Sequence, residues 1–426
     1  MWVIISFLVM IAIGVPVGYS MILTAFFFVK FTGAVNMSFV PSAMISGVSS
    51  YTMLAIPFFM LVGELMNNSG ITKRIFTYAD ASVGHITGGL GHVNVMSSMI
   101  FSGMSGAAVA DVAGLGAIEI KAMKDQGFDA EFAVGITAAS SIIGPIIPPS
   151  SPMVLFGIAA GISIGGLFMG GITVGIIMGL LMMLTVYLIA KNRNYPRHER
   201  YPVSRQFRAF VVALPALLAP VILIGGIFSG YFTPTEAASV AAFYSLIVGI
   251  FIYKDFKIQN LPKVLLSSIE NLGMVMLLMA SGKLFAWVLG MEKIAELAAS
   301  AIFTLTDNHY VILFLMNLIL LFMGTFMETN ASIFILTPIL LPIASAIGVH
   351  PIQFGVIFIF ALMIGLLTPP MAICLFLTSK IGGISFNSAF KAVRPYYIGL
   401  IIVLILINVF PEITLFVPKL LLGSSF

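Results

Sequence analysis

The chain has 426 residues, of which 60% are hydrophobic and only 8% are charged, and its mean hydropathy is +1.12. A water-exposed globular surface needs many more polar side chains than this, so the composition excludes a soluble fold. The formal net charge of +4 is modest for this length and does not suggest a nucleic-acid-binding surface. The single cysteine, Cys374, excludes an intrachain disulfide.

Long apolar stretches occur along the chain, for example at residues 2–29 and at residues 396–410. A bilayer core about 30 Å thick needs about 20 apolar residues for each helical span. No basic segment precedes the first stretch and no polar cleavage site follows it, so we expect a retained span and not a cleaved signal. These features predict an all-α integral membrane protein with many spans.

Basic residues indicate which loops face the cytoplasm. Residues 191–208 hold six Lys and Arg residues and one acid, which predicts a cytoplasmic loop. Two further spans, 209–228 and 233–253, lead to Lys254 and Lys257, which would return the chain to the same side. By this count the N-terminus lies in the cytoplasm and the C-terminus on the periplasmic face.

An internal repeat has an offset of 221 residues. Its glycine and proline pairs are Gly103 with Gly324, Gly144 with Gly365, Gly161 with Gly382, Pro41 with Pro262, Pro148 with Pro369 and Pro149 with Pro370. We therefore expect one repeat in residues 1–190, a second in 233–426, and a connecting basic loop and span in 191–232. The extra span would place the repeats in opposite orientations, and inverted repeats are typical of secondary transporters.

Each repeat is expected to contain a helical hairpin and a span interrupted by prolines. The predicted hairpins cover residues 91–120 and 310–344, and the predicted broken spans cover 131–160 and 352–378. Flanking charges predict that the first hairpin enters from the cytoplasm and the second from outside. Irregular backbone is tolerated within a membrane only where protein or water satisfies it, so we expect a polar site between the hairpin tips.

The two hairpin turns carry different candidate groups. Residues 102–106, Ser-Gly-Met-Ser-Gly, offer hydroxyls and freed carbonyls to a sodium ion, although small residues could instead only let helices approach closely. Glu328 in the second turn and Asp111 after the first are acids within apolar segments, which suggests a function. Either acid could instead cap a half-helix, because carboxylates stabilise helix N-termini.

The paired prolines of the two broken spans remove backbone donors and interrupt the helices. The freed carbonyls and half-helix N-termini would suit a cation beside an anionic solute. A simple proline kink explains one such span, but it explains two matched spans poorly. The only Gly-Lys pair, Gly282-Lys283, is followed by Leu284, so the sequence has no nucleotide-binding loop and ATP hydrolysis is not expected.

Three segments resemble the large membrane subunit of tripartite ATP-independent periplasmic (TRAP) transporters. They are residues 102–124, residues 137–153 (TAASSIIGPIIPPSSPM) and residues 233–238 (TPTEAA), and the resemblance extends over nearly the whole chain. It implies an elevator-type fold of the ion-transporter superfamily and sodium-driven uptake of an organic acid across the bacterial inner membrane. It further implies a small membrane subunit and a soluble periplasmic binding protein as partners, with no cofactor other than sodium as the coupling ion.

The resemblance also implies the site residues. The first sodium site would comprise Ser102, Gly103, Ser105, Gly106, Gly144 and Pro145. The inverted counterpart would comprise Gly324, Thr325, Thr368 and Pro369. Substrate would contact Ser105, Ser150 and Ser151. Apart from the resemblance, Thr329 and Asn330 in the second hairpin turn are the further candidates for substrate contact if these serines only pack helices.

The substrates that the resemblance implies are carboxylates, and overall likeness favours sialic acid over a C4-dicarboxylate. Two other functions stay open from the sequence. A stand-alone sodium/carboxylate carrier of the same superfamily would need no binding protein, and a channel would need no sodium gradient. A membrane enzyme is disfavoured, because the sequence shows no nucleophile–base pair and no metal-binding cluster.

Overall fold

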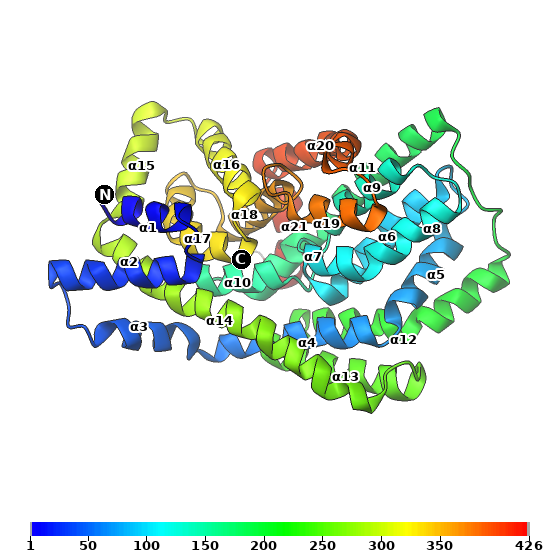
Figure 1. The fold of residues 1–426 in the computed structure, drawn as a ribbon, viewed down its shortest axis with the longest axis horizontal. Helices are drawn as coiled ribbons and strands as arrows, with labels where there is room; N and C mark the ends of the chain where they lie inside the picture. The colour runs from blue at the N-terminus through cyan, green and yellow to red at the C-terminus, as the bar shows by residue number, and fades with distance from the viewer. Residues whose placement is uncertain (1, 424–426) are drawn as a thin grey trace.

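The computed structural model describes residues 2–423, and the side chains of residues 102–105 and 422 are left aside within it. All regular elements in this range are helices, which confirms the predicted all-α class (Figure 1). Seven of these helices are long and apolar enough to cross a membrane, and one bent pair would make an eighth span. The length and composition of the helices thus match a multi-pass membrane protein.

The first helices lead to a bent span. The elements are α1 (Trp2–Ala12), α2 (Val17–Thr32), α3 (Phe39–Val48), the 3-10 turn η1 (Tyr51–Leu54), α4 (Ala55–Asn68) and α5 (Ile71–Val83). The chain bends by 55° between α3 and the segment that contains η1 and α4.

The first hairpin and broken span follow. The first arm of the hairpin is α6 (Gly89–Ser105), and its second arm runs through α7 (Ala108–Asp111), the π-helical η2 (Val112–Gly116) and α8 (Ala117–Asp125). The broken span consists of α9 (Ala130–Ser141) and α10 (Ser151–Ala160), and α11 (Ile164–Arg193) closes this half.

Helices α12 (Val203–Phe228) and α13 (Pro234–Ile247) follow the basic loop, and η3 (Val248–Ile252) extends α13 as a π-helix. Thr233 and Glu236 form a reciprocal capping box at the start of α13, as the sequence predicts. The short η4 (Ile258–Asn260) then leads into the long α14 (Leu261–Met291).

The second half repeats the order of the first. After α15 (Ile294–Leu305), the second hairpin consists of α16 (His309–Phe326) and α17 (Thr329–Ala346). The second broken span consists of α18 (Pro351–Gly365) and α19 (Ile373–Gly382), followed by α20 (Phe386–Val409) and α21 (Glu412–Leu422).

Helix starts in the two halves follow the sequence offset closely. The starts of α6 and α16 are 220 residues apart, those of α9 and α18 are 221 apart, and those of α10 and α19 are 222 apart. The Pro148–Pro149 and Pro369–Pro370 peptide bonds are both cis. The repeat in the sequence therefore corresponds to a repeat in the order and spacing of these helices.

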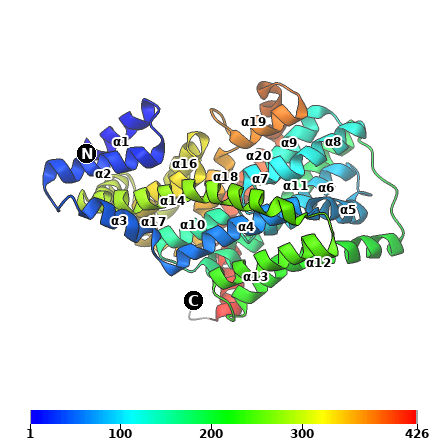
Figure 2. The ribbon, with the colours of Figure 1, turned by 60° about the horizontal axis from the view of Figure 1, so that its bottom comes forward.

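The hairpins and broken helices lie against a framework of long helices. Helix α14 packs along α2, α3 and α4, and α13 packs against α4 (Figures 1 and 2). In the interior, α9 contacts α19 and α20, while α10 contacts α17. From Ile352 to Gly365 each residue of α18 is buried, as expected for a helix that is apolar on all sides.

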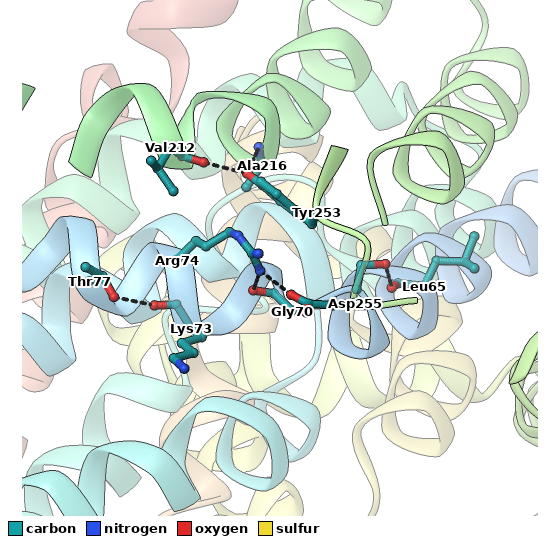
Figure 3. A network of polar contacts seen from close by, with 10 residues as sticks. Leu65, Gly70, Lys73, Arg74, Thr77, Val212, Ala216, Tyr253 and Asp255 are labelled. Atoms are coloured by element: carbon teal, nitrogen blue, oxygen red, sulfur yellow. Dashed lines mark hydrogen bonds and ion pairs between the residues drawn. The ribbon is translucent and has the colours of Figure 1, made fainter. Parts of the chain in front are cut away.

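A network of polar contacts holds α5 against α12 and against the segment after η3 (Figure 3). The Arg74 guanidinium forms an ion pair with Asp255 at 2.5 Å and lies 3.9 Å from the centre of the Tyr253 ring. The Tyr253 hydroxyl donates to the Val212 carbonyl at 2.9 Å and accepts from the Ala216 amide at 3.1 Å. These bonds hold α5, α12 and the segment after η3 together.

Candidate functional site

A cavity of about 550 Å³ lies where the hairpin tips and the broken helices meet α4 and α14. This volume is within the usual range for small-molecule sites, roughly 300–1,000 Å³. Its lining is largely apolar, and the polar residues among it are Glu64, Asn67, Ser151, Asn271, Glu328, Thr329 and Asn330. An apolar cavity with a few convergent polar groups is the usual form of a ligand site.

Four helices begin at this cavity. Its lining includes Ser151, Thr329, Ala108 and Ile373, which are the first residues of α10, α17, α7 and α19. The N-terminus of a helix carries the positive end of the helix dipole. No Lys, Arg or His lines the cavity in the part of the chain that the structure describes. Positive potential in the site therefore comes from backbone, a common arrangement for anion binding.

Two of these helix starts are capped by side chains. The Ser150 hydroxyl accepts from the Met153 amide at 3.2 Å and donates to the Pro145 carbonyl at 2.5 Å. Ser150 is fully buried and does not line the cavity, whereas its neighbour Ser151 does. Glu328 caps α17, where its Oε2 accepts from the Ala331 amide at 3.2 Å. Ser150 and Glu328 thus both serve as caps, and Glu328 also faces the cavity.

The first hairpin tip contacts the first broken span through backbone groups. The Ser151 amide donates to the Gly106 carbonyl at 3.3 Å. Gly106 has a φ of +60°, and a Cβ there would lie 2.8 Å from the Pro149 carbonyl oxygen, so only glycine fits. Pro145 lines the cavity, and Gly144 lies beside Ala107. The structure thus brings Gly106, Gly144 and Pro145 together.

Three further predicted residues of this site, Ser102, Gly103 and Ser105, lie in the last turn of α6. Their surroundings fall outside the described residues. Their proposed roles in binding sodium or substrate therefore stay predictions.

The second hairpin tip makes a matching contact with the second broken span. The Met371 amide donates to the Thr325 carbonyl at 3.1 Å, and a Cβ on Gly365 would lie 2.5 Å from the Gly324 Cα. The Thr368 hydroxyl lies 3.0 Å from the Ile364 carbonyl and 3.1 Å from the Tyr397 hydroxyl. The predicted residues Gly324, Thr325, Thr368 and Pro369 are therefore neighbours, but none of them lines the cavity.

A buried polar network supports the first hairpin. Asn94 Nδ2 on α6 donates to Glu119 Oε2 at 2.5 Å and to the Thr137 hydroxyl at 2.8 Å. The Ser140 hydroxyl donates to Asn94 Oδ1 at 2.6 Å, and the Ser98 hydroxyl reaches both Ser140 and Asp111. All six residues of this buried network are at least 98% buried. The network joins both arms of the hairpin to α9.

Sequence reasoning missed several of these polar residues. It singled out Asp111 and Glu328 as acids within apolar segments, and the same rule applies to Glu64 in AIPFFMLVGELMNN and would have found it. Asn67 and Asn271 carry no comparable local signal, because only the packing of α4 and α14 against the hairpins brings them to the cavity.

The whole length of the chain matches known transporters. Residues 4–413 match the family model of the tripartite ATP-independent periplasmic transporter, DctM component. The chain is 45% identical over 410 residues to the sialic acid TRAP transporter large permease protein SiaM of Vibrio cholerae, with 96% of each protein covered. It is 39% identical over 369 residues to the C4-dicarboxylate TRAP transporter large permease protein DctM of Pseudomonas aeruginosa, with 87% of this chain and 86% of that protein covered.

A longer relative and a solved structure are also similar. The sialic acid TRAP transporter permease protein SiaT of Haemophilus influenzae is 40% identical over 421 residues, which cover 99% of this chain and 68% of that protein. The crystal structure of the YdaH transporter of Alcanivorax borkumensis superposes with a TM-score of 0.62 at 13% identity, covering 88% of each chain. That likeness concerns the fold alone. The matches to the family model and to these relatives show that the chain belongs to the DctM family of TRAP transporter large permease subunits.

Proposed function

We propose that this permease subunit carries out sodium-coupled uptake of an organic acid across the bacterial inner membrane. The observation that carries the proposal is the convergence of the N-termini of α10, α17 and α19 on a cavity that no described basic side chain lines. Such a cavity suits a carboxylate, because backbone N–H groups and helix dipoles attract negative charge.

Sodium would supply the charge that the cavity lacks. Glu64 and Glu328 line the cavity, so a carboxylate entering alone would add a further negative charge in a medium of low dielectric. The two backbone junctions, where Gly106 meets Pro149 and Ser151 and where Gly324 meets Gly365, offer carbonyl oxygens at the hairpin tips. Half-helix ends and unwound carbonyls of this type coordinate sodium in other transporters.

We propose two partners and one group of substrates. The relatives are called large permease proteins of TRAP systems, which supports a separate small membrane subunit and a periplasmic binding protein as partners of this chain. The relatives with 45% and 40% identity are sialic acid systems, which favours sialic acid over a C4-dicarboxylate as substrate. In this proposal the hairpins and broken helices move as one unit against α4 and α14 in an elevator-type cycle.

Transport by reconstituted protein tests the proposal. Proteoliposomes with the chain and its small subunit, supplied with the binding protein, should take up labelled N-acetylneuraminate only with an inward sodium gradient. Equal uptake with choline in place of sodium would contradict sodium coupling, and uptake without the binding protein would indicate a stand-alone carrier. The inverted orientation predicts that a cysteine near Arg200 is labelled only from the cytoplasm and one near Asn308 only from outside. Labelling of both from one side would refute it.

A further inference from the structure

The cavity has two chemically different walls. The wall formed by the hairpins and broken helices carries the N-termini of α10, α17 and α19. The other wall is formed by α4 and α14, and its polar residues are Glu64, Asn67 and Asn271. The remainder of that wall is apolar, as at Phe59 and Met274. An anionic group is favoured at the first wall, whereas the second wall offers a carboxylate and two amides.

The polar groups of the second wall belong to two packed helices. Glu64 and Asn67 are separated by one turn of α4, and Ser267 and Asn271 by one turn of α14. The Ser267 hydroxyl donates to Glu64 Oε1 at 3.2 Å. Asn67 Oδ1 is buried without a hydrogen-bond partner among the described residues and lies close to Gly114 of η2. Glu64 is therefore held in place from α14, and Asn67 lies with its Oδ1 buried beside η2.

Glu64 differs from Glu328, the other acid in the cavity. Glu328 lies at the N-terminus of α17, where its Oε2 accepts from the Ala331 amide and its charge faces a favourable dipole. Glu64 lies in the third turn of α4, far from the N-terminus of that helix and one turn before its last residue, Asn68. A second anion next to Glu64 would meet a like charge with neither a helix N-terminus nor a basic side chain of the described lining to offset it.

We propose that Glu64, with Asn67 and Asn271, determines specificity by selecting solutes with one carboxylate and a hydroxyl-bearing far end. This inference rests on the proposed uptake of a carboxylate. With the solute carboxylate at the helix N-termini, its far end faces α4 and α14. Hydroxyl groups there donate to the Glu64 carboxylate and exchange hydrogen bonds with the two amides. A linear dicarboxylate would instead place its second charge against Glu64, and such repulsion is a common means of rejecting a wrong ligand.

Ligand competition on the purified complex tests this inference. The complex of the chain with its small subunit, in lipid nanodiscs with sodium, is incubated with labelled N-acetylneuraminate and increasing succinate. In the wild type succinate should compete poorly. Glu64→Gln keeps the shape of the side chain and removes its charge. The apparent affinity for succinate, relative to that for N-acetylneuraminate, should therefore rise at least about 10-fold. Asn271→Asp adds a charge to the same wall and should shift the preference in the opposite direction.

The matched control is Glu270→Gln, the same exchange at an exposed position of α14 that does not line the cavity, and it should leave the preference unchanged. If Glu64→Gln fails to assemble, the Asn271→Asp variant decides the question. An unchanged preference in the assembled variants, or equal competition by succinate in the wild type, would overturn the inference.

The sodium requirement separates this inference from other roles of Glu64. The half-saturating sodium concentration should be the same in the wild type and in Glu64→Gln. A shifted sodium requirement with an unchanged anion preference would place Glu64 in ion binding and overturn the specificity role. Sodium-dependent uptake without preference between the two acids would overturn only this inference, whereas a wild-type complex that transports no carboxylate would overturn the proposed function as well.

Discussion

The two hairpins follow the same helical path but differ in what holds them. In the first hairpin, a buried network bonds the second arm to α6 and bonds α6 in turn to α9; its members are Asn94, Ser98, Asp111, Glu119, Thr137 and Ser140. The positions 221 residues later hold Leu315, Ile319, Ser332, Leu340, Phe358 and Ala361. Of these only Ser332 is polar, and its hydroxyl donates to the Glu328 carbonyl within its own helix. The order of helices thus recurs in both halves, whereas the equivalent positions of the second half do not form this polar network among the described residues.

The second hairpin depends instead on close backbone packing. Gly324 of α16 and Gly365 of α18 lie so near that a Cβ on Gly365 would overlap the Gly324 backbone. Small residues that let helix backbones approach are a common means of association in lipid. The comparison indicates that hydrogen-bond geometry orients the first hairpin, whereas shape complementarity places the second.

The largest expected effect comes from breaking the polar network at its centre. Asn94→Leu removes the donor to Glu119 and Thr137 and the acceptor for Ser140, which leaves several buried polar groups without partners. Each such group costs about 1–3 kcal/mol, so we expect severe loss of folded protein. The yield and melting temperature of the purified complex measure this loss.

A similar exchange in the second hairpin is the control. Asn317 on α16 donates to Asn408, which keeps its own bond to the Leu404 carbonyl when Asn317 is replaced. Asn317→Leu should therefore cost about 1 kcal/mol or less. Equal losses in the two variants would show that the network does not distinguish the hairpins.

The second prediction tests the packing of the other hairpin. Gly365→Ala places a methyl group 2.5 Å from the Gly324 Cα, and backbone cannot move aside as a flexible side chain can. Overpacking of this type costs about 1–3 kcal/mol, which should lower the melting temperature. Gly273→Ala on α14 is the control, because no described atom lies within 4 Å of its added Cβ. A melting temperature for Gly365→Ala as high as that of the control would mean that the α16–α18 contact is loose.

Much of the helical framework could be predicted from the sequence because local residues encode it. The hydropathy predicts spans, and the Pro148–Pro149 and Pro369–Pro370 pairs interrupt helices at sites that proline chemistry dictates. The capping box at Thr233 likewise depends on residues three positions apart. Such signals need no knowledge of tertiary contacts.

The polar interior could not be predicted in the same way. Asn94 meets Glu119 and Thr137, which lie 25 and 43 residues away in sequence, and no periodic pattern marks these partners. Neighbouring residues can also differ: sequence reasoning treated Ser150 and Ser151 as a pair, but only Ser150 caps α10 and only Ser151 lines the cavity. A difference of one position on a helix turns a side chain by about 100°, so backbone geometry decides such roles.

The third prediction separates these two serines. Ser151→Ala should leave the membrane level of the protein normal and reduce apparent substrate affinity about 10-fold, because a hydrogen bond to a charged carboxylate contributes roughly 1.5–3 kcal/mol. Ser150→Ala removes the N-cap of α10 and should lower stability by about 1 kcal/mol. Uptake kinetics and melting temperatures of both variants measure the two effects. Wild-type affinity in Ser151→Ala would direct the search for substrate contacts to Thr329 and Asn330.

The smallest expected effect concerns Asp129 and His350, which precede α9 and α18 at the repeat offset. Hydrogen bonds from Tyr195 and Arg193 lower the pKa of the Asp129 carboxyl, so it stays charged in mild acid. His350 Nδ1 accepts from the Ile352 amide at 3.2 Å, and burial together with Lys419 lowers the pKa of the imidazole. A pKa below the unfolded value of about 6.5 means that the contribution of His350 is complete above that pH and is lost as the pH falls.

Melting temperatures measured from about pH 7.5 to about pH 5 should therefore show a small decrease that depends on His350 and not on Asp129. His350→Asn keeps an acceptor at the N-cap and does not titrate, so it should remove this decrease. Asp129→Asn should lower the melting temperature slightly at both ends of the range, because its ordinary pKa lies below the range and the folded pKa lies lower still. The same decrease in His350→Asn as in the wild type would assign the pH dependence to another group, and the two helix starts would then not differ in their response to acid.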